Sequence, residues 1–421
     1  MGNSTSAVYS AAGTDEADAL RRGPPATVRS VLLQARERTL RLAEDFRAAL
    51  GPRPQVPYAE ELNPPLWELG HVGWFQEWWL GRNPQRDLGS QADPSASRPR
   101  SLLPQADAWY DSSRVAHGSR WDLPLPDAAA TTRYLERTLA QTLALLDALP
   151  PGASDAELYF FRLVAVHELM HAEAAAYMGQ GLGIALRESS LPVTASNRAE
   201  LAVPATRFQL GSPAGGFAFD NELQAHPVDV AALAIDAEPV TWGAYVPFLE
   251  QGGYEEPQWW TPEGRLWLAK LPHRRPQALR RTPTGWEQMR DGRWEPVREE
   301  QVAQHLSAHE ADAWCRWAGR RLPTEAEWEC AAITHPGFRW GHAWEWTASR
   351  FEPYPGFQPH PYRDYSQPWF GSRRVLRGAS PATAPALAHP RYRNFYEPHR
   401  RDIFAGFRSV RTDHAPRPTA V

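Results

Sequence analysis

The spacing of apolar residues divides the chain into a helical N-terminal half and a C-terminal half of shorter segments. From Val28 to Leu50, apolar or small residues recur every three or four positions and a Gly-Pro pair ends the pattern, which predicts a long helix. Similar spacing predicts a second helix over residues 63–81 and a third over residues 127–149. A polar connection over residues 82–126 separates these two helices, and so long a connection is usually functional or a crossover.

A fourth helix is predicted from Ser154 to Gly179, and it carries two histidines. Ser154 and Glu157 have the spacing of a capping box, in which each side chain satisfies a backbone N–H of the first turn. His167 and His171 are four residues apart, so they project from one face of the helix, one turn above each other. Four helices with one long crossover make a bundle, a fold in which metal sites are built from inward side chains of facing helices.

The histidine pair has three interpretations. The first is two core histidines satisfied by hydrogen bonds. Two histidines four apart on an apolar helix weaken this interpretation, because burying both imidazoles without partners costs several kcal/mol. A zinc protease is the second interpretation, because residues 167–171 match H-E-x-x-H with Glu168 as general base, but no third-ligand pattern follows. The third interpretation is a three-histidine metal site completed from elsewhere in the chain. His71, within an aromatic stripe of the second predicted helix, is the expected third ligand.

The composition favours a cytoplasmic protein whose partners are small molecules. A chain of 421 residues with 42% apolar composition is long enough for two or three domains. The net charge is −4 and the basic residues are dispersed, which argues against a nucleic-acid or membrane surface. Cys315 and Cys330 are too few for a disulfide framework and are expected to pack in the core. Residues 1–26 lack periodicity and are predicted to form a mobile tail.

The C-terminal half shows short apolar runs broken by Gly, Pro and Asn from about Leu201 onward. This texture predicts an α+β domain of short strands and loops. Two helices are predicted there, one over residues 307–319 and one beginning at Thr324. Most of the 19 tryptophans follow residue 240, which indicates aromatic packing between irregular segments.

Several C-terminal segments resemble the formylglycine-generating-enzyme/sulfatase-modifying domain, which has a C-type-lectin-like fold. These segments are Pro239-Val-Thr-Trp-Gly-Ala-Tyr, Gly319-Arg-Arg-Leu-Pro-Thr-Glu-Ala-Glu-Trp-Glu, Trp344-Glu-Trp-Thr, Val375-Leu-Arg-Gly-Ala-Ser and Gly406-Phe-Arg. The N-terminal half resembles a DinB-type four-helix bundle, and together the halves are similar to the hercynine-dependent sulfoxide synthases of ergothioneine biosynthesis. The resemblance implies a DinB-like bundle over residues 27–190 and a catalytic domain over residues 200–415.

The same resemblance implies a nonheme iron(II) enzyme with O2 as co-substrate. Histidines that match His71, His167 and His171 bind the iron in that family. Three neutral imidazoles leave about three positions of an octahedral iron open. Spacing alone would fit a catalytic zinc equally well, so the choice of iron rests on the resemblance. Hercynine carries a quaternary ammonium, a group that aromatic faces bind, and a domain rich in aromatic residues suits it.

The family's C-terminal substrate motif corresponds to residues 392–408. Asn394 and Phe395 match positions that contact hercynine, and Arg400 matches an arginine that can hold the carboxylate of the second substrate. Where the glutamylcysteine-using enzymes have Asp and often Gln, this chain has Tyr396 and Met170. Both departures make the pattern most similar to the selenoneine synthases, which join hercynine to a selenosugar. The alternatives are a sulfoxide synthase that uses cysteine or γ-glutamylcysteine, and a non-catalytic lectin-like binding module.

The resemblance also implies a tyrosine that donates a proton during the reaction. We expect this residue in the loop over residues 352–365, with Tyr362 as the first candidate, Tyr365 as the second and Tyr354 as the third. In the crossover, Arg114 or Arg120 is expected to reach the second substrate.

Overall fold

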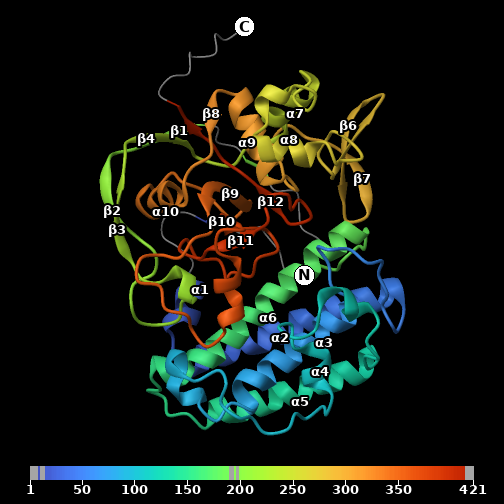
Figure 1. Ribbon diagram of the computed structural model, residues 1–421, viewed down its shortest axis with the longest axis vertical. Coiled ribbons are helices and arrows are strands. Elements are labelled where there is room, and N and C mark those ends of the chain that lie inside the picture. The colour runs from blue at the N-terminus through green and yellow to red at the C-terminus, as the bar shows by residue number, and fades with distance from the viewer. Residues whose placement is uncertain (1–7, 10–14, 189–193, 196–198, 413–421) are drawn as a thin grey trace.

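The computed structural model describes residues 8–9, 15–188, 194–195 and 199–412. Its helical half forms the lower part of Figure 1, and its strands and short helices form the upper part. The helices of the lower part are α1 (Asp15–Arg22), α2 (Pro25–Leu50), α3 (Pro65–Gln76), α4 (Ala106–Tyr110), α5 (Ala128–Asp147) and α6 (Asp155–Leu182). A π-helical turn, Glu77–Gly81, continues α3. No helix of the described residues is long and apolar enough to cross a membrane.

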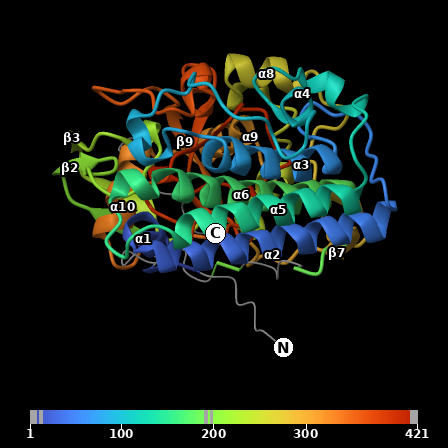
Figure 2. The same cartoon turned by 90° about the horizontal axis from the view of Figure 1, so that it is seen from below.

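The four long helices lie where the spacing predicts them. In Figure 2, α2, α5 and α6 run side by side. The capping box at the start of α6 is present, with the Glu157 backbone N–H donating to Ser154 Oγ and the Ser154 N–H donating to the Glu157 carboxylate. The predicted stop at Gly179 is wrong, because α6 continues to Leu182 and ends at Gly183, which has a left-handed φ of 70°. A glycine provides this conformation without steric cost.

Part of the predicted N-terminal tail is a helix. Asp15–Arg22 forms α1, in which Ala17 and Leu20 are fully buried. Arg21 forms a buried ion pair with Glu222, 201 residues later in the chain, at 2.8 Å. A helix of two turns gives too few repeats for its apolar face to be recognised from spacing, so these tertiary contacts stabilise it. Residues 1–7 and 10–14 of the predicted tail lie outside the described residues.

The C-terminal half contains two four-stranded sheets and two smaller ones. The first sheet has the order β1 (Glu200–Val203), β4 (Leu233–Asp236), β13 (Val410–Arg411), β8 (Arg320–Arg321), and the second has the order β11 (Asn394–Tyr396), β10 (Arg374–Ala379), β9 (Ala343–Arg350), β12 (Ala405–Gly406). A hairpin pairs β2 (Thr206–Leu210) with β3 (His226–Val230), and a meander joins β5 (Leu279–Thr282), β6 (Gly285–Arg290) and β7 (Arg293–Pro296). All paired strands are antiparallel except β12 and β9.

Four α-helices accompany these sheets in the described part of the C-terminal half. The two predicted helices are present as α9 (Ala308–Trp317) and α10 (Glu325–Thr334), capped by Ser307 and Thr324. Two short helices, α7 (Trp242–Glu250) and α8 (Pro262–Leu268), were not predicted, because each is under three turns long and contains proline. Cys315 and Cys330 are buried on α9 and α10, as expected for core residues.

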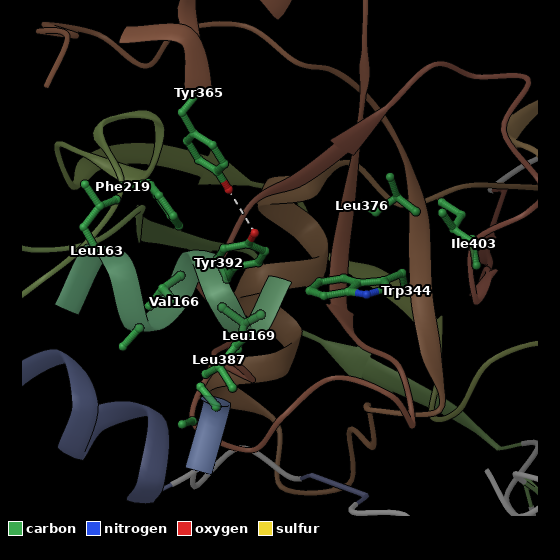
Figure 3. Packing of buried hydrophobic residues seen from close by; sticks show 14 of the residues in the cluster. Leu163, Val166, Leu169, Phe219, Trp344, Tyr365, Leu376, Leu387, Tyr392 and Ile403 are labelled. Atoms are coloured by element: carbon green, nitrogen blue, oxygen red, sulfur yellow. Dashed lines mark hydrogen bonds between the residues drawn. The ribbon is translucent and has the colours of Figure 1, made fainter. Parts of the chain in front are cut away.

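Helix α6 connects the two halves of the molecule. Figure 3 shows Leu163, Val166 and Leu169 of α6 projecting toward side chains of the C-terminal half. Those side chains include Phe219, Tyr365, Tyr392, Leu387 and Trp344, and all belong to the same buried cluster as the α6 residues. Because one helix packs into both halves, groups on α6 lie between the bundle and the sheet domain.

Candidate metal centre

Three histidines converge between α3 and α6. His71 comes from α3 and His167 and His171 from α6, and each offers one nitrogen within 4.8 Å of the others. The Nε2 atoms of His167 and His171 are 3.1 Å apart. This is the arrangement that the spacing predicted, and three nitrogens at such distances can all reach one ion.

The ring of His71 is fixed by its neighbours on both sides. Its Nδ1 lies 2.8 Å from the Tyr110 carbonyl oxygen, to which it can only donate, so Nε2 carries the free lone pair. The indole of Trp67 stacks on the imidazole with ring centres 4.8 Å apart and an interplanar angle of 10°. Tyr110 approaches closely because residue 70 is glycine, where a Cβ would lie 2.1 Å from the Tyr110 ring. The backbone carbonyl and the indole together fix the orientation of the His71 ring.

Glu68 orients His171. Its Oε2 accepts a hydrogen bond from His171 Nδ1, and its other oxygen accepts one from Asn63 Nδ2 at 2.5 Å. Burial opposes ionisation of Glu68, but the attraction of His171 and these hydrogen bonds outweigh it and lower the pKa to about 2. The sequence analysis overlooked Glu68, although its position one turn before His71 was a visible signal. A carboxylate behind a histidine ligand is typical of metal sites.

The electrostatic environment keeps two of the histidines neutral. Burial, together with repulsion from His171, lowers the pKa of His71 to about 3. Burial and the same repulsion lower the pKa of His167 well below its usual range. Neutral imidazoles are the form that binds metal ions, and a divalent cation would convert the mutual repulsion of these rings into attraction. The three nitrogens and the Glu68 carboxylate therefore fit a divalent metal ion.

The zinc-protease interpretation is wrong, because Glu168 faces away from the three histidines. Its carboxylate receives two hydrogen bonds from Arg36 of α2, at 2.7 and 3.1 Å, and both residues are at most 3% exposed. Arg36 also donates to Gln76 Oε1 at 2.8 Å. Adjacent residues of a helix point about 100° apart. Glu168 therefore points toward Arg36 in the bundle core, whereas His167 points toward the other two histidines. A glutamate paired in this way cannot serve as general base there.

A cavity lies between α6 and the C-terminal half, and one of its lining residues, Met170, is next to His171 in the sequence. It has a volume of about 30 Å³ and is lined by residues of α6 and of the C-terminal half, namely Met170, Glu173, Tyr177, Trp344, Leu387, Tyr392, Asn394, Tyr396 and Ile403. Met170, Asn394 and Tyr396 were among the predicted substrate-binding residues, and the structure brings them together here. The walls are aromatic and apolar, with a few polar groups, as in small-molecule sites.

Glu173 is a polar cavity residue that the sequence analysis missed. Its carboxylate accepts hydrogen bonds from Trp344 Nε1 at 2.7 Å, from Ser380 Oγ at 2.5 Å and from Thr383 Oγ1 at 2.9 Å. Burial raises the pKa of Glu173, and these donors partly oppose the rise. A glutamate within an otherwise apolar helix was the available signal, but its partners are more than 170 residues away in the chain.

Comparisons with known proteins agree with this two-part architecture. Residues 16–179 match the DinB superfamily, and residues 188–341 and 338–413 match the Sulfatase-modifying factor enzyme 1-like domain. The hercynine oxygenase of Mycolicibacterium smegmatis is 34% identical over 445 aligned positions, which cover 91% of this chain and 98% of that protein. The chain belongs to the hercynine oxygenase family. The hercynine oxygenase of Mycobacterium tuberculosis is 33% identical over 90% of this chain and 96% of its own length. A formylglycine-generating enzyme of Streptomyces coelicolor is 26% identical and covers 48% of this chain and 82% of its own.

The three candidate tyrosines of this chain occupy different surroundings. Tyr362 packs edge-on against Phe75 at 4.9 Å between ring centres and against His167 at 6.2 Å, so it adjoins the metal centre. Burial, together with the nearby carboxylates of Asp364 and Asp111, raises the pKa of Tyr362. Tyr365 lies behind Tyr362, with its hydroxyl 2.9 Å from that of Tyr392. Tyr354 is committed elsewhere, because its hydroxyl donates to Glu325 at 3.0 Å.

Two predicted substrate residues of the C-terminal half, Phe395 and Arg400, lie outside the cavity wall. Phe395 lies between Asn394 and Tyr396 on β11, and because successive strand residues point to opposite faces, it stacks on Phe351 instead, with ring centres 3.9 Å apart. The structure therefore does not bring Phe395 to this cavity. Arg400 lies behind Tyr396, with its guanidinium 5.0 Å from the ring centre.

The three arginines predicted to reach the second substrate, Arg400, Arg120 and Arg114, all have protein partners. Arg400 donates to the two oxygens of Asp402 at 2.6 Å each, so its charge is already balanced by a carboxylate. Arg120 lies over Trp67, 3.9 Å from its ring centre, and donates to Asn63 Oδ1 at 2.6 Å. Arg120 therefore stands next to the metal centre, on the outer side of the indole that stacks on His71. Arg114 is exposed, and its nearest carboxylate is Asp111 at 3.4 Å.

Proposed function

We propose that the protein is an iron(II)- and O2-dependent oxidoreductase that joins a chalcogen donor to the imidazole carbon of hercynine. The observation that carries this proposal is a cluster of three histidines, two of them buried, in a chain that aligns with the hercynine oxygenase of Mycolicibacterium smegmatis over 91% of its length. The relatives favour sulfur as the chalcogen, so carbon–sulfur bond formation is the main candidate.

His71, His167 and His171 would hold the iron, which binds and reduces O2 when present. The protein supplies the rest of the environment. Tyr110 and Glu68 fix the tautomers of two ligands, and Phe75 stacks on His167 with ring centres 3.5 Å apart. Three protein nitrogens leave ligand positions free for small molecules.

Hercynine would occupy the cavity beside Met170. Its quaternary ammonium suits the aromatic faces of Trp344 and Tyr392. The Asn394 amide offers a donor and an acceptor for the imidazole or the carboxylate of the substrate. A volume of about 30 Å³ holds only about two water molecules, so lining side chains must move when hercynine enters. Met170 is unbranched and flexible enough to do so.

Tyr362 would act as the proton donor. Its hydroxyl stays protonated at neutral pH, since burial raises its pKa, and its ring touches the ligand His167. Tyr365 would act as a support, because its hydroxyl is already bonded to that of Tyr392.

A selenosugar donor is the second candidate, favoured by the polar groups around Tyr396. An amino-acid thiol needs partners for both its ammonium and its carboxylate. Tyr396 offers a neutral hydroxyl that hydrogen-bonds with Tyr177, and Arg400 is paired with Asp402. A flat aromatic surface with neutral hydroxyls suits a sugar better than a zwitterion, and a selenol ionises more readily than a thiol.

Anaerobic reconstitution with iron(II) tests both candidates. The loaded protein would receive hercynine, O2 and one of four donors, namely cysteine, γ-glutamylcysteine, 1-thioglucose or 1-selenoglucose, and mass spectrometry would identify the products. Fastest coupling of a cysteine derivative supports the sulfoxide synthase, and fastest coupling of the selenosugar supports the second candidate. No coupling with any donor, in protein that retains iron, would refute the proposal and favour a binding module.

A further inference from the structure

Three consecutive residues hold the loop that carries Tyr362. Phe219 stacks on Tyr365 with ring centres 3.9 Å apart. Asp220 accepts hydrogen bonds from the His360 backbone N–H, at 3.1 Å, and from Ser366 Oγ. Asn221 Nδ2 donates to the same Ser366 Oγ at 2.9 Å. Residues 219–221 lie about 140 positions before the loop and contact it on both sides of Tyr362.

The hydrogen bond from His360 has no local substitute. Pro359 and Pro361 flank His360, and proline has no backbone N–H. The His360 amide is therefore the one backbone donor in these three residues, and Asp220 Oδ2 accepts it. The His360 side chain adds a second attachment, since its Nδ1 lies 3.0 Å from the Tyr159 hydroxyl of α6.

The Asp220 carboxylate is itself held in place. Asp220 is 3% exposed and Ser366 is fully buried, so water does not compete for these hydrogen bonds. Asp220 begins a 3-10 turn that ends at Glu222, and Glu222 is fixed by its buried ion pair with Arg21 of α1. A continuous set of contacts thus connects α1 to the loop.

We propose that Asp220 is a positioning residue: one carboxylate binds the two ends of the segment from His360 to Ser366 and thereby holds Tyr362 against His167. This inference rests on the proposed role of Tyr362. Asparagine at this position would replace one acceptor oxygen by an NH2 group, so one of the two attachments would be lost. The freed segment would let the Tyr362 ring move away from the metal centre, and a displacement of about 1 Å costs a reaction step about 100-fold.

Hydrogen exchange tests the attachment without reference to catalysis. In the purified protein, Asp220→Asn is expected to speed amide exchange in the peptide covering residues 357–366 by about 2- to 10-fold. Ser366→Ala removes the hydroxyl that bonds Asp220 and Asn221 and keeps the carboxylate, and it should also speed exchange in the same peptide. Asp229→Asn is the matched control, because Asp229 is exposed on β3. Unchanged exchange in both Asp220→Asn and Ser366→Ala would overturn the proposal even if the enzyme proves to have another activity.

A double-mutant cycle tests whether Asp220 acts through Tyr362. The measured quantity is the ratio of coupled product to donor oxidised without hercynine, in protein of equal iron content. Asp220→Asn is expected to lower the ratio about 10- to 100-fold, and adding it to Tyr362→Phe should lower it no further. If the double variant lowers the ratio by the product of the two single effects, Asp220 does not act through Tyr362 and the positioning role is overturned. Failure of the unmodified enzyme to couple hercynine at all would instead refute the proposed function, and the exchange result would still decide the attachment.

Discussion

Replacing Glu68 tests whether the three histidines bind a metal ion. Glu68 is 15% exposed in its side chain, accepts a hydrogen bond from His171 Nδ1 and carries a negative charge next to the centre. Glu68→Gln keeps an oxygen that can accept the His171 hydrogen but removes the charge. Glu68→Ala removes both and frees the imidazole to rotate or change tautomer. Carboxylates behind histidine ligands contribute about 10- to 100-fold to metal affinity.

We therefore expect Glu68→Gln to weaken metal binding about 10-fold, or about 1.4 kcal/mol, and Glu68→Ala about 100-fold, or about 2.7 kcal/mol. Anaerobic titration with cobalt(II), followed by visible absorption, gives the dissociation constants directly. Glu136→Gln on the exposed face of α5 is the matched control for loss of a glutamate charge. If both Glu68 variants bind cobalt(II) within about twofold of the unmodified protein, Glu68 does not support a metal ligand.

Three further predictions concern catalysis, stability and donor choice. Tyr362→Phe should retain metal binding and shift the products from coupling to oxidation of the donor alone, whereas Tyr365→Phe should mainly lower the stability of the fold. Mass spectrometry of the products measures this shift, and normal coupling by Tyr362→Phe would show that another residue is the proton donor. Arg36→Met leaves the buried Glu168 unpaired, so it should lower the free energy of unfolding, measured by urea titration, by about 3–5 kcal/mol. Arg29→Met, at an exposed ion pair of the same helix, should lower it by under about 1 kcal/mol. Equal losses would contradict the role of burial. Tyr396→Asp should raise kcat/KM for γ-glutamylcysteine relative to 1-selenoglucose, and an unchanged ratio would show that residue 396 does not select the donor.

The helical bundle and its histidines could be predicted from the sequence because their signals are local. Helical spacing, the Ser154 cap and the prolines that open α3 each act within a turn or two of the chain. The meeting of His71 with the α6 pair followed from one further rule, that inward faces of bundle helices share a core. These signals needed no knowledge of the second domain.

The surroundings of the site were not predictable because they depend on contacts between distant segments. The orientation of Phe395 depends on which face of β11 is turned to the cavity, and its strand is only three residues long. The pairing of Arg400 with Asp402 depends on loop conformation, although only one residue separates them in the sequence. Asp220 reaches the Tyr362 loop across about 140 residues, and no local pattern marks such a contact.

Helix α6 explains why the metal centre and the cavity lie together. His167 and His171 project from α6 toward α3, while Met170, Glu173 and Tyr177 follow at offsets of three and four and line the cavity. The rise of a helix places His167 and Met170 about 4.5 Å apart along the axis, so a molecule in the cavity is within one turn of the ligands. The bundle alone supplies the histidines, but the partners of Glu173 all come from the C-terminal half. The histidines can thus be brought together by bundle helices alone, whereas the cavity on the adjoining face of α6 requires that the C-terminal half be docked there.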